Sequence, residues 1–454
     1  MGTDFIAFII VLGVLIFIHE LGHFLVARYF GVGIEKFSLG FGPRLFGKKV
    51  GITDYRVSAV PLGGYVKMVG EDPDSELDPE DISISYSHKH VFKRILIVAA
   101  GPTFNILLAA VIYFGFFSVV GIEDVTPVIR NIDIGGPAQK AGLAKGDLIL
   151  SIDEAPVDSW YDIFNAIKRS EGRTLSLKLK RDDSVIALAL SPQLNTGQDL
   201  FGDEVKYYDL GISGYPEIEA IIGGVSNGFP AQAAGLEKND KIVAINGEKV
   251  NSWNKMQKII LESQGKILLT TIQRGDSSFD VKITPALTKN KNALGEIEES
   301  YKIGVSSAGN ILSDEDKFLK KFSVFEALFE SVRQTYRFTH LTIVSIAKLI
   351  QGKLSINTLG GPIMIAEMAG QQAREGASDF LFFMALISIN LAVLNFLPIP
   401  VLDGGHLFFY FIEAAIGKPV NTKIREIAQQ VGIFVLILLM IFVFYNDITR
   451  YFFS

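Results

Sequence analysis

The pattern His19-Glu20-x-x-His23 combines residue types that can bind a metal and use it for hydrolysis. Residues four apart in a helix lie on one face, so both imidazoles can reach a single metal ion. Glu20 falls beside them and can take a proton from a water that the metal activates. The ligand types favour zinc, which lowers the pKa of bound water to about 7 and makes hydroxide available at neutral pH.

The motif is short and can occur by accident, so its setting matters. His19, Glu20 and His23 lie inside the apolar stretch Phe5–Ala27. A charged residue at the centre of a membrane helix costs about 2.5–3.5 kcal/mol. Three ionisable residues within five positions therefore need compensation, which a metal and water would provide. The alternative is a set of hydrogen-bonded polar side chains between helices.

A zinc site built on two histidines lacks a third protein ligand. The chain has six histidines and no cysteine, which also excludes disulfides and a thiol nucleophile. His88 and His90 lie in a basic loop and are most simply surface residues, and His340 lies in a charged helical segment. Asp403 and His406 remain as candidates, directly after another apolar stretch.

Four apolar stretches are long enough to cross a bilayer, which needs about 20 residues. They are Phe5–Ala27, Ile95–Val120, Phe380–Leu397 and Ile427–Tyr445. The first lacks a basic start and a cleavage pattern of small residues, so we expect a retained anchor rather than a signal peptide. The composition, 49% hydrophobic and 20% charged, indicates spans joined to globular modules.

Basic residues between the first two spans place that loop in the cytoplasm. They are Arg28, Lys36, Arg44, Lys48, Lys49, Arg56, Lys67, Lys89, Lys93 and Arg94. The large insert after span two and both termini then face outward. His19 lies about 21 Å from the outer end of its span, at 1.5 Å per residue, so the site is nearer the cytoplasmic face.

The crossings between the two candidate ligand segments must be even in number, because Asp403 has to reach the same face as His19. Spans two and three satisfy this condition. The segment Phe322–Gly352 is apolar at helical spacing but carries several charges. We therefore expect an amphipathic helix at the outer membrane surface there, not a fifth span.

The insert at about 122–372 contains an internal repeat. The run from Pro137 to Leu143 matches the run from Pro230 to Leu236, at an offset of 93 residues. Asp147 and Trp160 match Asp240 and Trp253 at the same offset. Each unit has short alternating strands, turn signals and a short helix, and it resembles PDZ domains of bacterial proteases. PDZ domains bind peptides by adding a strand to a sheet edge. The alternative is a pair of β-rich spacers with no ligand.

The segment Gly31–Gly70 is glycine-rich and alternating, and Ile34–Phe46 and Tyr55–Met68 are expected as strands joined by turns. Asn105 in span two and Asn395 in span three are polar side chains in apolar helices. They can hydrogen-bond a substrate backbone, or simply join neighbouring helices.

Three features together resemble the site-2 protease family, regulator of sigma-E protease type. They are His19-Glu20-x-x-His23 in the first span, tandem PDZ-like units after span two, and Asn395-x-x-Pro-x-Pro-x-Leu-Asp403-Gly. The resemblance covers essentially the whole chain. It implies that Asp403 is the third zinc ligand, which leaves His406 as a supporting or structural residue.

The resemblance also implies how a substrate is held. The strands would form a membrane re-entrant sheet that takes the substrate as an added strand, with Gly63 and Gly64 among the residues that bind it. The alternative is a cytoplasmic β-hairpin unconnected with substrate. Asn105 and Asn395 belong to motifs linked to substrate handling in this family. We also place Pro398 and Pro400 in the substrate site, where they break the helix and could give Asp403 a fixed, non-helical approach.

The function implied is that of a zinc metalloendopeptidase cutting within the transmembrane segment of single-span proteins. The PDZ-like units would act as a size filter, so that this is the second cut of a cascade. The expected substrate is an anti-sigma factor, with leftover signal peptides as a further class. The expected location is a bacterial inner membrane, with the PDZ-like units in the periplasm. The net charge of −6 gives no reason to expect a nucleic-acid partner.

Two other classes make different predictions. A zinc transporter or metal sensor would carry more than one ligand cluster along a path, and we find one. A membrane scaffold with a degenerate core would have lost Glu20 or Asp403, and both are present.

The expected fold class is a polytopic α-helical membrane protein with four transmembrane helices, a membrane-associated β-hairpin or sheet, and two α+β PDZ-like domains inserted between spans two and three. The expected segments are a first transmembrane helix (1–30), a β region (31–91), a second transmembrane helix (92–121), two PDZ-like domains (122–208 and 209–300), an amphipathic helix with linker (301–372), a third transmembrane helix (373–399), the Leu-Asp-Gly loop (400–426), and a fourth transmembrane helix with the C-terminus (427–454).

Overall fold

The computed structural model describes residues 2–71, 77–291, 297–309 and 316–453. These residues form two compact units. The first, here called the membrane unit, comprises Met1–Gly121, Lys321–Gly352 and Ile356–Ser454. The second, here called the insert unit, comprises Ile122–Lys320 with Lys353–Ser355.

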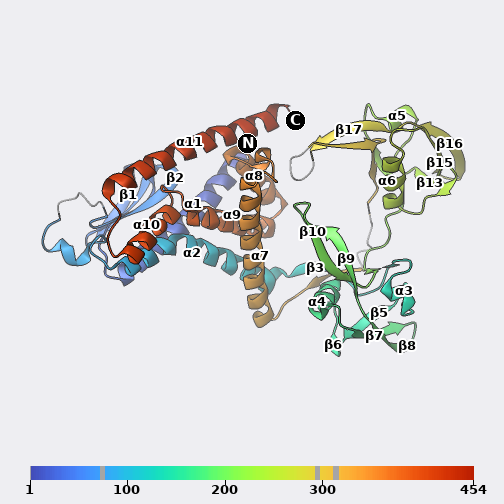
Figure 1. Cartoon of the computed structure of the whole chain (residues 1–454), viewed down its shortest axis with the longest axis horizontal. Helices are drawn as coiled ribbons and strands as arrows, with labels where there is room; N and C mark the ends of the chain where they lie inside the picture. Colours follow the sequence, from blue (N-terminus) through green and yellow to red (C-terminus); the bar gives the residue numbers. More distant parts are fainter. Residues whose placement is uncertain (1, 72–76, 292–296, 310–315, 454) are drawn as a thin grey trace. The chain divides into compact units, whose positions relative to one another are not determined.

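Helices dominate the membrane unit (Figure 1). They are α1 (Gly2–Tyr29), α2 (Val91–Gly115), α7 (Val324–Ile350), α8 (Pro362–Glu375), α9 (Ala377–Phe396), α10 (Asp403–Ile416) and α11 (Thr422–Phe453). Short 3-10 turns lie at Asp81–Ile84 and Ile356–Thr358, and α2 continues as a π-helical turn, Phe116–Val120.

Four described helices are long and apolar enough to cross a membrane. They are Gly2–Tyr29, Val91–Val120, Ala377–Phe396 and Thr422–Arg450. Each contains, to within one residue at its end, one of the four apolar stretches expected from the sequence. By length and composition, therefore, the sequence located the candidate spans correctly.

Close packing of α1 against α2 depends on a glycine. A methyl group on Gly22 would lie 2.5 Å from the carbonyl oxygen of Ala100, inside van der Waals contact. Small residues let helix backbones approach in a membrane, where dispersion contacts replace the hydrophobic effect as the driving force. The N-terminal part of α1 packs on α8, where Arg374 forms an ion pair with Asp4.

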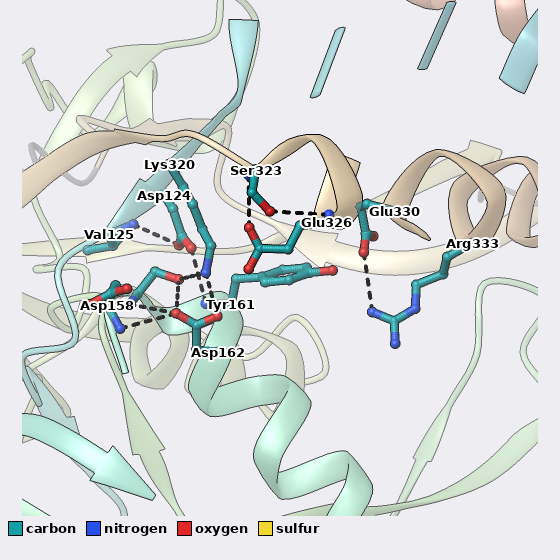
Figure 2. A network of polar contacts seen from close by, with 11 residues as sticks. Asp124, Val125, Asp158, Tyr161, Asp162, Lys320, Ser323, Glu326, Glu330 and Arg333 are labelled. Carbon is teal, nitrogen blue, oxygen red and sulfur yellow. Dashed lines mark hydrogen bonds and ion pairs between the residues drawn. The ribbon is translucent and has the colours of Figure 1, made fainter. Parts of the chain in front are cut away.

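The helix α7 is amphipathic and is not among the four apolar helices. It begins with a capping box in which Ser323 and Glu326 satisfy each other's backbone N–H groups, as Figure 2 shows. Figure 1 shows α7 running across the direction of α2, and Phe338 on α7 stacks on Tyr113 of α2. Its exposed apolar side chains include Phe325 and Phe329. An amphipathic helix at Phe322–Gly352 agrees with the expectation from the sequence.

Two long, bent strands follow α1. They are β1 (Ile34–Val50) and β2 (Thr53–Met68). Phe37 is paired with both Tyr55 and Val66, so the first part of β1 lies between the two halves of β2. The second part of β1 pairs with the first half of β2, as in Lys48 opposite Tyr55.

Glycines make these bends possible. Gly40 and Gly42 have φ of +88° and +87°, and Gly63 has φ of +128°, a region that favours glycine. Beyond Gly63 the last segment of β2, residues 64–68, forms one edge of the sheet. Among the described residues, no further strand pairs with this edge.

The insert unit consists of two similar halves. The first half holds β3 (Ile122–Val125), β4 (Asn131–Ile132), α3 (Pro137–Lys140), β5 (Leu148–Ile152), β6 (Ala155–Pro156), α4 (Trp160–Ser170), β7 (Leu175–Arg181), β8 (Ser184–Leu190), β9 (Gln193–Gln198), β10 (Glu204–Asp209) and β11 (Ile212–Ser213). The second half holds β12 (Ile222–Val225), α5 (Pro230–Ala233), β13 (Lys241–Ile245), β14 (Glu248–Lys249), α6 (Trp253–Glu262), β15 (Leu268–Arg274), β16 (Ser277–Ile283), β17 (Ala286–Lys291), β18 (Ile297–Lys302) and β19 (Val305–Ser307). The last strand, β20 (Lys317–Lys320), returns to the first half.

Each half contains a four-stranded sheet with the same strand order, β6-β5-β7-β8 and β14-β13-β15-β16. Each half also has its own buried apolar core. The internal repeat expected from the sequence is therefore a repeat of structure. Each core extends past the expected boundary of its domain, because Leu210 belongs to the first core and Ile303 to the second.

A buried ion pair recurs in both halves. Asp147 binds Arg181 through two hydrogen bonds of 2.7 and 2.8 Å, and Asp240 binds Arg274 in the same way. Both aspartate side chains are fully buried. The sequence repeat had paired the two aspartates without revealing their arginine partners.

The chain enters and leaves the insert unit through a pair of adjacent strands. Residues of β3 pair antiparallel with β20, from Ile122 opposite Lys320 to Val125 opposite Lys317. Figure 2 shows Lys320 reaching Asp162 on α4, while Asp124 accepts a hydrogen bond from the backbone N–H of Tyr161. These contacts fix the paired strands to the first half of the insert unit.

Candidate metal centre

Three potential ligand atoms converge in the membrane unit. Nε2 of His19 lies 3.2 Å from Nε2 of His23 and 3.0 Å from Oδ2 of Asp403. Nε2 of His23 lies 3.5 Å from the same carboxylate oxygen. A tetrahedral zinc ion with bonds of about 2.0–2.1 Å has ligand atoms about 3.3 Å apart. The three separations fit such an ion.

The chemistry of the donor set supports the same interpretation. Oδ2 of Asp403 is buried and faces the Nε2 atoms of both imidazoles. Among the described residues, His19, His23 and Asp403 are the one group of histidine, aspartate and glutamate side chains found to converge in this way. The residues present therefore fit a zinc ion held by two imidazoles and one carboxylate.

The helix α1 presents both imidazoles and Glu20 on neighbouring positions of one turn. Burial of His23 is nearly complete, and its other ring nitrogen, Nδ1, lies 2.9 Å from the carbonyl oxygen of Ile97 on α2. Gly101, also on α2, faces both histidines. A methyl group there would lie 2.3 Å from Nε2 of His23 and 2.8 Å from Nε2 of His19.

Asp403 reaches the histidines because it is the first residue of α10. The proline-containing segment before it ends α9 at Phe396, since a residue before proline avoids the helical region. Gly404 and Gly405 allow the turn that follows. A methyl group on Gly404 would lie 2.1 Å from the carbonyl oxygen of Leu397.

Charge and burial shift the pKa values of Asp403 and His406, the two candidates for the third ligand, by different routes. Burial alone would raise the pKa of Asp403, but hydrogen bonds with His19 and His23 hold this pKa below its ordinary value. Burial lowers the pKa of His406. His406 lines the adjacent cavity but is not one of the converging donors. The geometry thus favours Asp403 over His406 as the third ligand.

A cavity of about 250 Å³ opens beside the three donors. One wall is the edge segment of β2, through Tyr65, Val66 and Met68, and Glu20 lines the cavity close to this edge. The remaining lining residues are His19, His23, Glu71, Tyr86, Val98, Asp403, His406, Tyr410 and Arg425. The cavity could therefore hold a peptide strand and a water molecule in contact with the Glu20 carboxylate.

The residues expected to bind substrate lie in different surroundings. Gly64 packs beside the base, since a methyl group there would lie 3.2 Å from Cγ of Glu20. Gly63 forms the bend before the edge segment. Asn395 is half-buried in the last turn of α9, and Pro398 and Pro400 follow it. None of these five residues is among those lining the cavity.

Asn105 is fully buried, with its side-chain nitrogen 3.3 Å from Nδ1 of His19. Sequence reasoning missed Ile97, Gly101, Tyr410 and Arg425. A pattern of residues four apart, from Ile97 through Gly101 to Asn105, was a signal that α2 faces the histidines. Arg425 offered no signal, because its helix is far from the motif in the sequence.

A nearby network links α10 to the segment that precedes α2. Arg94 forms an ion pair with Glu413 and lies 4.8 Å from the centre of the Tyr410 ring. The hydroxyl of Tyr410 accepts a hydrogen bond from Tyr86 at 3.1 Å. Burial raises the pKa of Tyr86 well above its ordinary value, so this hydroxyl stays protonated. The network holds the helix that carries Asp403 against the wall of the cavity.

Two histidines and a glutamate on one turn of an apolar helix of membrane-spanning length, with an aspartate from a second helix facing the histidines, are the arrangement of a zinc metalloprotease built within membrane helices. The chain belongs to peptidase family M50, which matches residues 7–439. The predicted resemblance to the regulator of sigma-E protease type is thereby confirmed, and the chain is a zinc metalloendopeptidase.

Relatives match along nearly the whole chain. It is 35% identical over 448 residues to protease RseP of Yersinia pestis, covering 98% of each chain. It is 34% identical over 465 residues to the regulator of sigma-E protease RseP of Escherichia coli (strain K12), again covering 98% of each. A relative from Pasteurella multocida, named as a zinc metalloprotease, is 35% identical over 462 residues, covering 98% of this chain and 99% of its own.

Proposed function

We propose that this protein hydrolyses a peptide bond within the transmembrane segment of single-span membrane proteins, with zinc held by His19, His23 and Asp403. The observation that carries the proposal is the position of the converging donors. Two of the three donors lie in α1, an apolar helix of membrane-spanning length, and Asp403 meets them from the start of α10. Beside them is a strand edge with which no other strand pairs among the described residues. The family membership supports the proteolytic chemistry.

Glu20 is the proposed general base. When bound, zinc lowers the pKa of a coordinated water and polarises the scissile carbonyl. Glu20 would accept a proton from the attacking water and pass it to the leaving amine. This role requires the carboxylate to lie beside both the donors and the substrate backbone, as its place in the cavity allows.

The edge of β2 is the proposed substrate platform. A transmembrane helix satisfies its own backbone hydrogen bonds, so it must be unwound before water can attack. Pairing with residues 64–68 would replace those lost bonds with strand bonds, as in other cases of peptide addition to a sheet edge. Gly63 and Gly64 would shape this edge, while Asn395, Pro398 and Pro400 would border the path of the substrate.

The proposed topology has four spans, with the loop after α1 in the cytoplasm and the insert unit outside. The basic residues of that loop support this orientation. The two repeat halves would be tandem PDZ-like domains in the periplasm of a bacterial inner membrane, and α7 would lie on the outer membrane surface. The metal centre would then be near the cytoplasmic side.

The proposed substrates are anti-sigma factors whose outer domain has already been removed, together with leftover signal peptides. The names of the relatives support a place in sigma-E regulation. The insert unit would admit only trimmed substrates, so this protein would make the second cut. Release of a cytoplasmic fragment would follow.

The test is cleavage of a single-span model substrate in membranes, with and without a folded outer domain. We expect the wild type to cut only the trimmed substrate, and Glu20→Gln and chelator treatment to abolish this cut. Equal cleavage by wild type and Glu20→Gln would assign the activity to another protease. A wild type that holds zinc but cuts neither substrate would contradict the proposed substrate class.

A further inference from the structure

One face of α2 contacts both histidines of the metal centre. Ile97, Gly101 and Asn105 are four residues apart and so lie along the same side of the helix. The carbonyl oxygen of Ile97 lies 2.9 Å from Nδ1 of His23, and the side-chain nitrogen of Asn105 lies 3.3 Å from Nδ1 of His19. Gly101 leaves room for both rings between these contacts.

A histidine that binds a metal through Nε2 carries its proton on Nδ1, and that proton needs an acceptor. For His23 the acceptor is the carbonyl oxygen of Ile97. For His19 the facing group is the side chain of Asn105, whose Oδ1 is buried and has no hydrogen-bond partner within the described part of the chain. Turning the amide by 180° keeps its shape and places this oxygen against Nδ1 of His19.

We propose that Asn105 is a positioning residue that accepts a hydrogen bond from Nδ1 of His19 and so directs Nε2 toward the metal. The proposal rests on the zinc role of His19 proposed above. It assigns Asn105 to the metal ligand and not to substrate backbone, the role expected from the sequence. Its full burial supports this assignment, since a residue that contacts substrate must be reachable.

At this position in an apolar helix, an amide is a better acceptor for the imidazole N–H than a carboxylate would be. It supplies a neutral acceptor and adds no charge to an apolar helix, where a charge is costly. The backbone of Asn105 is itself held, because its carbonyl oxygen accepts a hydrogen bond of 2.8 Å from the hydroxyl of Ser388 on α9. The acceptor is therefore fixed in place before any metal binds.

The test compares Asn105→Leu and Asn105→Asp in the full-length protein in detergent, with zinc affinity measured by competition against a coloured chelator. Asn105→Leu keeps the size of the side chain and removes the acceptor, so we expect about 10–100-fold weaker zinc binding. Asn105→Asp keeps an acceptor oxygen and should retain most of the affinity. Thr103→Val is the matched control, because it removes a side-chain hydrogen bond of 2.7 Å to the carbonyl oxygen of Ala99 on an exposed face of α2.

Two results would overturn the proposal. One is unchanged zinc affinity in Asn105→Leu together with a raised KM for the trimmed substrate, which would make Asn105 a substrate contact. The other is an equal loss of zinc affinity in Asn105→Leu and Asn105→Asp, which would show that an acceptor oxygen at this position does not support metal binding. If Asn105→Leu does not insert and fold, Asn105→Ala takes its place. Zinc affinity needs no substrate, so the result can be interpreted even if the proposed proteolysis is wrong.

Discussion

Oδ2 of Asp403 lies 3.0 Å from Nε2 of His19, although the two residues belong to opposite ends of the chain. The contact is made by the first residue of α10 and the middle of α1. It brings together two segments that the whole insert unit separates in the sequence. Removing either side chain should therefore disrupt the same metal centre.

Asp403→Ala should weaken zinc binding strongly. The loss should exceed the roughly 10–100-fold that typically follows removal of a residue that only hydrogen-bonds a ligand. The reason is that the substitution removes one of three converging donor atoms. His406→Ala should have a smaller effect, because His406 lines the cavity outside that set. Zinc affinity of the purified full-length variants is the measurement. A larger loss in His406→Ala than in Asp403→Ala would reverse the assignment of the third ligand.

Glu20→Gln should lower the cleavage rate by about 10²–10⁴-fold, the contribution typical of a general base. The amide has the same shape but cannot accept the proton at neutral pH. Zinc content should remain that of the wild type, because Glu20 is not among the converging donors. Single-turnover cleavage of the trimmed substrate, with metal analysis of the same sample, checks both statements. Cleavage near the wild-type rate would remove Glu20 from the role of base.

Gly101→Ala should impair zinc binding, because the added methyl group would lie 2.3 Å from Nε2 of His23. Gly115→Ala in the same helix is the matched control, since nothing lies within 4 Å of the methyl group that it adds. Zinc affinity and the amount of folded protein in membranes should be measured for both. Equal behaviour of the two variants would show that α2 does not pack against the histidines as described.

Arg274→Gln should destabilise the second half of the insert unit, because the buried carboxylate of Asp240 loses the two hydrogen bonds that Arg274 donates to it. We expect about 1–3 kcal/mol, the cost of an unsatisfied buried group, toward the lower end because Arg274 is partly exposed. Lys258→Gln is the control, since its ion pair with Glu262 is exposed and surface pairs contribute about 0–1 kcal/mol. Protease susceptibility of the insert in urea, in the full-length protein, measures the difference. Equal midpoints for the two variants would contradict the prediction.

The same ion pairs predict how the insert unit responds to acid. Burial raises the pKa of Asp147 and Asp240, but hydrogen bonds from Arg181 and Arg274 outweigh it and leave both values below the ordinary range. Their stabilisation is therefore full above the unfolded pKa of about 3.9 and is lost as the pH falls through the lower folded value. The urea midpoint of unfolding of the insert should therefore decrease as the pH is lowered below about 3.9. This decrease should be smaller in Arg274→Gln than in the wild type. A pH dependence unchanged by that variant would exclude the pair as its cause.

Much of the membrane unit was predictable because apolar length and helical spacing are local properties. The four candidate spans follow from hydropathy alone, and the spacing of His19 and His23 already places two ligands on one helix face. The repeat was equally visible, because Asp147 and Asp240 recur at a constant offset. Their partners, Arg181 and Arg274, recur at that offset too, yet only the fold shows that each pairs with its aspartate.

Residue type and position alone leave both Asp403 and His406 possible as the third ligand, and the family resemblance favours Asp403. The fold agrees with the resemblance, because the turn at Gly404 and Gly405 brings the carboxylate, not the imidazole, to the histidines. For Asn105 the sequence allows either a substrate contact or a contact between helices, because the partner of a polar residue in an apolar helix depends on the neighbouring helix.

The sequence by itself thus determined the local features: a helix turn with two candidate ligands and a candidate base, four apolar stretches and a duplicated β-rich insert. Tertiary structure decided which distant carboxylate meets the two histidines, which strand edge borders the cavity beside them, and which face of α2 contacts them. The physical reason is that periodicity and hydropathy act over a few residues. Convergence of α1, α2 and α10 depends on close helix packing at Gly22 and Gly101, which only the folded chain defines.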